Sequence, residues 1–272
     1  MLNAKLCTVL SIFLCATVWN AIAHAQEKKV ALVIGNGAYK SEALRNPTND
    51  SHVVGEALRG LGFDVIEREN VGFRDLIAAL REFSIRAKNS QVRLLYYAGH
   101  GMQVKGRNYL IPVDAEIADV EDVSRKTADL NDLLERLGDL RFGINVVILD
   151  ACRNNPFNFV TIVSNDGRKV RVRAPSSKQG LAAAEAPSGT LIAYSTSPGA
   201  VAVDGGSSSN SAYTRHLVAH LSTPGQTIEQ LFKKVRRGVA NETNNSQVPW
   251  EASSLMGDFC FRLGPGGRCG SD

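Results

Sequence analysis

The sequence predicts an α/β fold in which a mostly parallel open sheet of about six strands carries helices on both faces. Continuous apolar runs, such as KVALVI at residues 29–34 and INVVIL at residues 144–149, are typical of strands buried on both faces. Amphipathic helical segments alternate with these runs along the chain. The composition, 44% hydrophobic and 21% charged over 272 residues, excludes a disordered tail, a collagen-like repeat and a polytopic membrane protein.

Local patterns place each element. Apolar runs that end in glycine or polar residues predict strands at residues 29–34, 64–67, 92–97, 144–149, 190–195 and 258–262. Apolar residues spaced three or four apart predict helices at residues 46–61, 72–87, 130–137, 211–221 and 227–243. Gly106-Arg107, flanked by residues 102–105 and 108–111, predicts a hairpin.

Residues 1–25 have the layout of a secretory signal peptide. Lys5 precedes an apolar run at residues 6–19, and Ala23-His24-Ala25 is a small-x-small cleavage site. The run is short for a membrane span, although an uncleaved anchor is the alternative. We therefore expect an exported protein, periplasmic or secreted, that has no membrane attachment after cleavage.

The net charge bears on the partners of the protein, and the cysteines bear on its disulfides. A net charge of +4 is too weak and too dispersed to indicate a nucleic-acid partner. Two of the five cysteines lie in the signal segment, which leaves Cys152, Cys260 and Cys269. Cys260 and Cys269 stand nine residues apart across a Gly/Pro-rich turn, so they can pair in an oxidising compartment. Capture of Cys152 in a disulfide is the alternative that the sequence leaves open.

Reactive side chains stand where two predicted strands end. His100 follows the strand at residues 92–97, and Cys152 follows the strand at residues 144–149. Ligands of open α/β sheets bind beyond the carboxyl ends of the strands, so we expect the imidazole and the thiol to lie close together. An imidazole favours the nucleophilic thiolate and can protonate a leaving amine. The backbone N–H groups of Gly101 and Cys152 are the expected oxyanion hole.

The histidine precedes the cysteine by 52 residues, which is the caspase pattern. Several segments resemble the caspase-like (C14) peptidases, in particular the bacterial proteins related to metacaspases and orthocaspases. They are YYAGHG at 96–101, LDACR at 149–153, AYSTSPG at 193–199, Asn49-Asp50, GRNYL at 106–110 and PWEASSL at 249–255. The resemblance spans residues 28–263 and implies a caspase-haemoglobinase fold, a Cys152/His100 dyad and endopeptidase activity.

The resemblance also implies a substrate preference. Caspases, which cleave after Asp, keep a Gln where this chain has Asp150 and an Arg where it has Asp204. Asp50 and Asp150 match the pocket acids of the metacaspases and orthocaspases, which cut after Arg or Lys. A swap from base to acid reverses the charge that a pocket accepts. We therefore expect a peptide or protein substrate with a basic residue before the scissile bond. Separately, Ser195 stands at the end of a predicted strand without a nucleophile-elbow motif, so we expect it to line the substrate cleft.

Residues 158–180 are the one long stretch without a predicted element before the tail at residues 264–272. Its basic side chains are Arg168, Lys169, Arg171, Arg173 and Lys178. Caspases are cut between subunits in the corresponding place. An enzyme specific for basic residues can therefore process itself in this loop, and a solvated surface loop is the alternative.

Other functions have weaker signals. Gly35-Asn-Gly37 lacks the third glycine of a dinucleotide fingerprint. His216 and His220 lie one helical turn apart without a third ligand nearby, and the acids at residues 114–122 lack a calcium-loop spacing. We therefore expect no metal and no cofactor, although several metacaspases need Ca²⁺. A non-catalytic caspase-fold scaffold is the main alternative function. A Cys-dependent amidotransferase is a third, but such enzymes place the Cys before the His.

Overall fold

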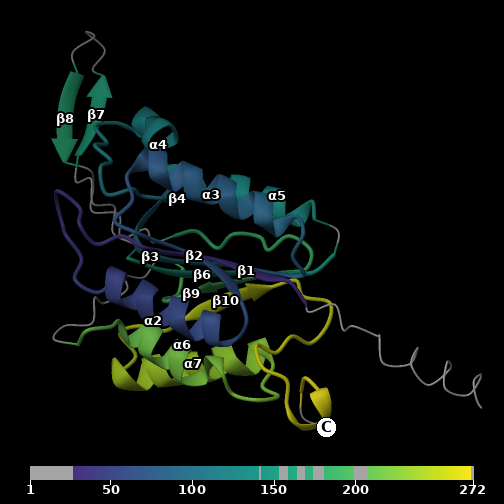
Figure 1. Ribbon diagram of the computed structural model, residues 1–272. Coiled ribbons are helices and arrows are strands. Elements are labelled where there is room, and N and C mark those ends of the chain that lie inside the picture. Colours follow the sequence, from purple (N-terminus) through teal and green to yellow (C-terminus); the bar gives the residue numbers. More distant parts are fainter. Residues whose placement is uncertain are drawn as a thin grey trace, which may run out of the picture.

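Strand β3 (Val92–Val104) lies at the centre of an eight-stranded sheet with β10, β9, β6, β3, β1 and β2 in that order (Figure 1). The structure is a computed structural model that describes residues 27–140, 142–152, 159–163, 169–173, 181–198 and 208–270. The other strands of the sheet are β1 (Lys29–Gly35), β2 (Asp64–Glu69), β4 (Arg107–Leu110), β5 (Ala128–Asp129), β6 (Ile144–Cys152), β9 (Thr190–Tyr194) and β10 (Trp250–Ser253). The predicted α/β class is confirmed.

The central strands are parallel, and their register is continuous. Strand β1 pairs with β2 on one edge and with β3 on the other, β3 pairs with β6, and β6 pairs with β9. Only β10 closes this row in the antiparallel sense, against β9. Strand β3 continues beyond the parallel part and turns back into β4, which is the hairpin predicted around Gly106-Arg107.

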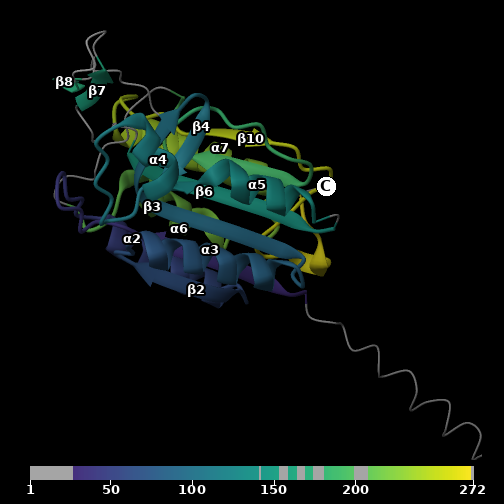
Figure 2. The same cartoon turned by 90° about the horizontal axis from the view of Figure 1, so that it is seen from above.

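Helices cover both faces of the sheet, as Figures 1 and 2 show. They are α2 (Pro47–Gly60), α3 (Phe73–Ala87), α4 (Val120–Lys126), α5 (Leu130–Gly138), α6 (Ala212–Leu221) and α7 (Ile228–Glu242). Alternate residues of β3 supply the two cores. Leu94 and Tyr96 pack with residues of α2, α6 and α7, whereas Leu95 and Tyr97 pack with residues of α3 and α5. Burial on both faces explains why β3 is apolar without a polar alternation.

The strand predicted at residues 258–262 is wrong. The last strand is β10, where Trp250 pairs with Tyr194 and the two rings lie 5.8 Å apart. Phe259 and Phe261 are instead buried in the core beneath the sheet. The apolar pattern at residues 258–262 indicates that side chains are buried, but it does not show that the segment pairs as a strand.

Cys260 and Cys269 form a disulfide with a Cα–Cα distance of 5.5 Å.

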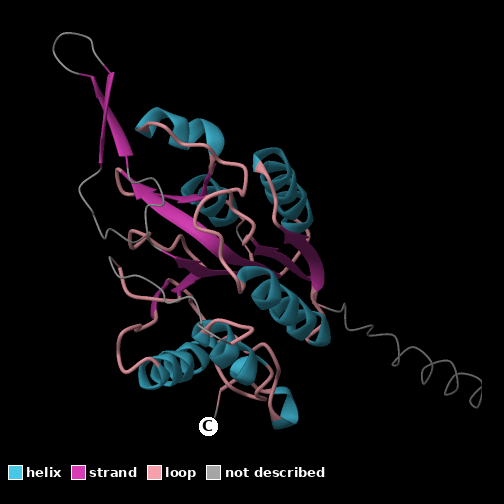
Figure 3. Ribbon diagram, turned by 90° about the vertical axis from the view of Figure 1, so that its left-hand side faces the viewer, coloured by secondary structure: helices cyan, strands magenta, loops and turns pink. Residues whose placement is uncertain are grey.

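The stretch at residues 158–180 contains structure that its composition did not predict. Strands β7 (Phe159–Val163) and β8 (Lys169–Arg173) form a separate two-stranded antiparallel ribbon. Figures 1 and 3 show this ribbon projecting from the body of the molecule. Arg168 and Lys178 lie outside the described residues.

The proposed signal segment, residues 1–25, also lies outside the described residues. Within the part of the chain that the structure describes, no helix has the length and apolar character needed to cross a membrane.

Candidate active site

The parallel parts of three neighbouring strands, β3, β6 and β9, end at one edge of the sheet. His100 of β3 pairs in register with Cys152, the last residue of β6. Ser195 directly follows β9, and its backbone N–H donates to the Leu149 carbonyl of β6 at 2.9 Å. The fold thus places the backbone of residue 152 directly beside that of His100, in the crevice position where open α/β sheets bind ligands.

Tyr39 fixes both the backbone and the ring of His100. The His100 side chain is buried, and its backbone N–H donates to the Tyr39 hydroxyl at 2.8 Å. The two rings lie 4.3 Å apart at an angle of 48°. One side chain from the loop after β1 therefore sets the position and the tilt of the imidazole.

The backbone of Glu42 fixes the tautomer of His100. The imidazole Nε2 lies 2.7 Å from the Glu42 carbonyl oxygen. A carbonyl oxygen only accepts hydrogen bonds, so Nε2 carries a proton and donates it. In the neutral ring, Nδ1 is then the basic nitrogen. Glu42 has a φ of 56°, a left-handed conformation that is uncommon for glutamate and that aims its carbonyl at the ring.

A second tyrosine holds the turn beyond His100. The Tyr97 hydroxyl donates to the carbonyl oxygen of His100 or of Ile111, which lie 2.8 and 2.9 Å away. Tyr39 also donates to Ile111, at 3.0 Å. The chain must pass these hydroxyls closely at Gly99, where a Cβ would lie 2.7 Å from the Tyr39 oxygen and where φ is 153°. Glycine is therefore required at this position.

Two buried carboxylates meet at the start of α6. Asp50 of α2 is 2% exposed and accepts hydrogen bonds from the Ser211 backbone N–H at 3.0 Å and from Asn210 Nδ2 at 2.9 Å. Asp150 of β6 is 9% exposed and accepts from the hydroxyls of Ser211 at 2.5 Å and Thr214 at 3.1 Å. Ser211 therefore contacts both carboxylates, which come from segments that are far apart in the sequence.

Tyr96 is buried close to both of these carboxylates, Asp50 and Asp150. Its hydroxyl lies 2.6 Å from that of Thr214. Burial, together with the negative charges of Asp150 and Asp50, raises the pKa of Tyr96 well above its ordinary value. The two acids thus share one low-dielectric region beneath the carboxyl ends of β3 and β6.

Comparison with known proteins identifies the family. A sequence model of the caspase domain, peptidase family C14, matches residues 28–260. The chain belongs to this family. Membership indicates a cysteine-peptidase-type function for this caspase domain, and the caspase-like fold expected from the motifs is confirmed.

Two curated relatives resemble part of the caspase domain. They are the mucosa-associated lymphoid tissue lymphoma translocation protein 1 of Homo sapiens and its homologue from Mus musculus, each 32% identical over 143 residues. The match covers 52% of this chain but only 17% of each relative. The likeness therefore concerns the domain and not the whole of those proteins.

The caspase domain brings together most of the residues expected from the sequence. His100, Cys152 and Ser195 lie at one sheet edge, and Asp50 and Asp150 meet at α6. Ser195 is buried, and its carbonyl accepts from Gln247 Nε2 at 2.8 Å. Asp204 lies outside the described residues.

The expected oxyanion donors remain a prediction. Gly101 follows His100 in β3 and pairs with Leu110 of β4. A Cβ at Gly101 would lie 3.1 Å from Leu181 Cδ2 and 3.4 Å from the Ala151 Cβ, so the backbone here has little room for a side chain.

The candidate metal ligands have other partners. His216 Nε2 lies 2.9 Å from Glu242 Oε2. In the acidic stretch, Asp119 caps α4 by accepting from the Asp122 N–H, and Asp122 accepts from the Ala118 N–H. Among the described residues, no group of three or more His, Cys, Asp or Glu side chains is arranged to hold a metal ion.

Sequence reasoning missed the residues that hold the site together. Tyr39, Glu42 and Ser211 all contact predicted site residues. The serine had a detectable signal, since it directly precedes a helix and serine is a preferred N-cap residue. Glu42 had none, because it acts through its carbonyl group.

Proposed function

We propose that the protein is an exported cysteine endopeptidase in which Cys152 is the nucleophile and His100 is its acid–base partner. The register of His100 with Cys152 carries this proposal. Paired residues on neighbouring parallel strands are about 4.8 Å apart, which suits a proton transfer between two side chains on the same face. The hydrogen bond from Nε2 to Glu42 supports the role of Nδ1 as the base.

The proposed reaction has two halves. The Cys152 thiol gives its proton to the imidazole, and the thiolate attacks the carbonyl carbon of the scissile peptide bond. The N–H groups of Gly101 and Cys152 stabilise the resulting oxyanion. The C–N bond then breaks as the imidazolium protonates the leaving amine, which leaves a thioester. Water, deprotonated by the imidazole, attacks the thioester, and the returning proton restores the thiol as the carboxylic acid product leaves.

We further propose that the enzyme cleaves after Arg or Lys. Asp50 and Asp150 place two carboxylates in one buried region below the sheet edge. An arginine side chain is suited to two carboxylates because its guanidinium forms paired hydrogen bonds with each. An aspartate in the same place would add a like charge to a low-dielectric site. On the sequence alone, we propose Asp204 as a third acid of this pocket.

A protease assay with varied substrates tests this function. The mature chain is given fluorogenic peptides that differ only in the residue before the scissile bond, Arg, Lys, Asp or Ala. We expect Arg to exceed Asp by at least about 100-fold in kcat/KM, and Cys152→Ala to abolish turnover. A preference for Asp would refute the pocket assignment.

The pocket acids are tested by matched variants. Asp150→Asn should lower the Arg-to-Ala ratio of kcat/KM by roughly 30-fold or more, because one charged partner of the guanidinium is lost. Asp139→Asn, at an exposed carboxylate beyond α5, should keep the wild-type ratio. Equal losses in both variants would exclude a specific role for Asp150.

Thiol reactivity separates the enzyme from a scaffold. A catalytic Cys152 is expected to react with iodoacetamide at near-neutral pH faster than a free cysteine does, because the imidazolium stabilises the thiolate. His100→Ala should remove this advantage. A slow thiol with no dependence on His100 would favour the non-catalytic scaffold.

A further inference from the structure

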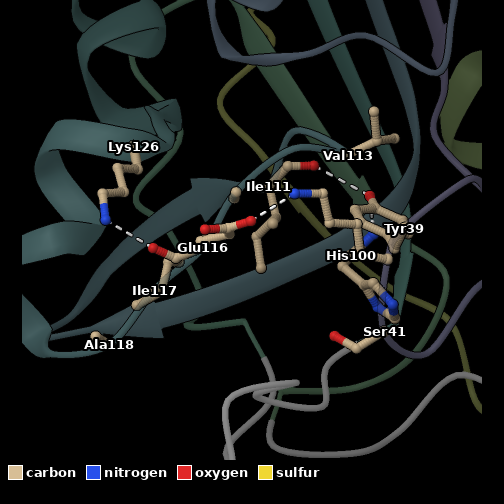
Figure 4. Close-up of a pocket in the computed structure, with 11 residues that line it drawn as sticks. Tyr39, Ser41, His100, Ile111, Val113, Glu116, Ile117, Ala118 and Lys126 are labelled. Atoms are coloured by element: carbon tan, nitrogen blue, oxygen red, sulfur yellow. Dashed lines mark hydrogen bonds and ion pairs between the residues drawn. The ribbon is translucent and has the colours of Figure 1, made fainter.

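A hollow opens directly beside His100, with a cavity volume of about 370 Å³. It is lined by two segments, residues 39–41 after β1 and residues 111–118 after β4, together with His100 and Lys126. Figure 4 shows His100 at one end of this hollow, next to Tyr39 and Ser41, and Lys126 at the other end. The catalytic role proposed above for His100 does not account for this space.

The hollow lies on the side of His100 that faces away from Cys152. Strand β3 has β6, which ends in Cys152, on one edge and β1 on the other. The segment that follows β1 forms one wall. The segment that forms the opposite wall, residues 111–118, also lies toward β1 and β2. Its Val113 N–H donates at 3.0 Å to the carbonyl of Val71, just beyond β2. Residue 152, the imidazole and the hollow therefore follow one another along the sheet edge.

This order matches the path of a leaving group. During acylation the acyl half of the substrate is attached to sulfur, whereas the imidazole must contact the departing nitrogen in order to protonate it. The chain that begins at that nitrogen then continues past His100, away from Cys152. The hollow is the space next to the imidazole on that side.

The lining indicates which side chain the hollow accepts. Its floor consists of buried apolar groups, chiefly Tyr39, Ile111 and Ile117. The charges at its rim are already paired. Lys40 Nζ donates to Glu116 Oε1 at 2.5 Å, and Lys126 Nζ lies 3.0 Å from Asp122 Oδ1. An aliphatic or aromatic side chain gains from burial on this floor, whereas a charged one loses hydration against the same apolar groups.

We propose that this hollow is the subsite for the residue that follows the scissile bond, and that it selects a large apolar side chain such as Leu or Phe. The proposal rests on the endopeptidase function proposed above. The substrate-binding site then recognises two different side chains. The acids at α6 bind a cation before the scissile bond, and the hollow beside His100 binds an apolar group after it.

Peptides that differ only after the scissile bond provide the test. Internally quenched peptides with Arg before the bond carry Leu, Phe, Gly or Asp after it, and kcat/KM is measured with the mature chain. We expect Leu and Phe to exceed Gly by about 10- to 100-fold, and Asp to be no better than Gly. Equal values for all four peptides would refute the subsite.

Filling the hollow supplies a matched pair of variants. Ala115 lines the hollow, so Ala115→Trp should reduce the Leu-to-Gly ratio to about 3-fold or less because the indole occupies the space. Ala78→Trp makes the same change on an exposed position of α3 and should keep the wild-type ratio. An unchanged ratio in Ala115→Trp, with unfolding like that of wild type, would refute the proposal.

Binding keeps the test independent of turnover. A labelled peptide with Arg-Leu at the scissile position should bind the Cys152→Ala protein about 10-fold more tightly than its Arg-Gly counterpart, and Ala115→Trp in that background should remove the difference. Hydrolysis of Arg-coumarin amides without any Leu preference would refute the subsite alone. A lack of hydrolysis of every basic peptide would refute the endopeptidase function itself.

Discussion

Tyr39 shows how much one side chain contributes to the geometry of the proposed dyad. Its hydroxyl accepts from the His100 N–H and donates to the Ile111 carbonyl. Tyr39→Phe removes both partners but keeps the ring against the imidazole. We expect a loss of about 1–3 kcal/mol in the free energy of unfolding, since buried polar groups lose their partner. We also expect kcat to fall roughly 10- to 100-fold as His100 shifts. Urea unfolding and peptide hydrolysis measure these two effects.

Tyr213→Phe is the matched control. Among the described residues, the buried hydroxyl of Tyr213 has no hydrogen-bond partner. Its removal should therefore leave the free energy of unfolding unchanged or raise it, with kcat close to wild type. If both variants lose stability and activity equally, the contact from Tyr39 to His100 has no special role.

The residues of the site differ in how far the sequence could predict them. His100 follows the apolar run of β3, and Cys152 is the last residue of β6. The strand pattern alone therefore placed the two residues side by side at one sheet edge. The supporting contacts join residues that are distant in the chain, such as Tyr39 with His100 and Asp150 with Ser211. Such contacts depend on loop conformation and on helix docking, which local patterns do not encode.

Helix α6 connects local helix chemistry to the proposed pocket. Ser211 caps it, accepting from the Thr214 N–H at 2.9 Å, and also donates to Asp150. Ser211→Ala should lower the free energy of unfolding by about 1 kcal/mol through the lost cap. It should also raise KM for Arg peptides, because Asp150 loses a partner that orients it. Thermal unfolding and steady-state kinetics measure the two effects.

Helix α7 supplies the control for a cap that lies away from the acids. Thr227 forms a capping box with Gln230. Thr227→Ala should lower stability by a similar amount but leave KM unchanged. A rise in KM in both variants would show that general loosening, rather than the orientation of Asp150, is responsible.

The elements with strong apolar or periodic patterns were predicted well, and several short ones were not. The strong runs of β1, β3, β6 and β9 have patterns that burial on both faces makes unmistakable. Helix α4 and strand β5 are short, and β5 is defined only by its pairing with β4. Strands β7 and β8 are also short and pair with each other, apart from the main sheet. The ribbon also bears on self-processing. Lys169, Arg171 and Arg173 belong to β8, which is paired with β7, and self-processing here stays a prediction. Because peptides are recognised as extended strands with free backbone groups, we expect cleavage in β8 to require that this pairing opens.

At the scale of the whole molecule, three buried tyrosines make stability depend on alkaline pH. Burial raises the pKa of Tyr96, Tyr97 and Tyr213 well above the ordinary value of 10.0. The folded protein therefore keeps these protons at a pH where the unfolded chain releases them. Stability from the neutral hydroxyls is fully present below pH 10 and is lost as the pH rises above it, with a slope that approaches about 1.4 kcal/mol per pH unit for each tyrosine.

Urea unfolding of the Cys152→Ala protein between pH 9 and pH 11 measures this loss without thiol exchange at the Cys260–Cys269 disulfide. Between pH 10 and pH 11 the free energy of unfolding should fall by roughly 3 kcal/mol from the three groups together, because each tyrosine of the unfolded chain is only half ionised at pH 10. Tyr213→Phe should reduce that slope by about one third, because one titrating group is removed while the fold is kept. A slope that is the same in both proteins would mean that Tyr213 ionises in the folded state as it does in the unfolded chain. That result would contradict the closed packing of α6 against β3, on which the position of the proposed pocket acids depends.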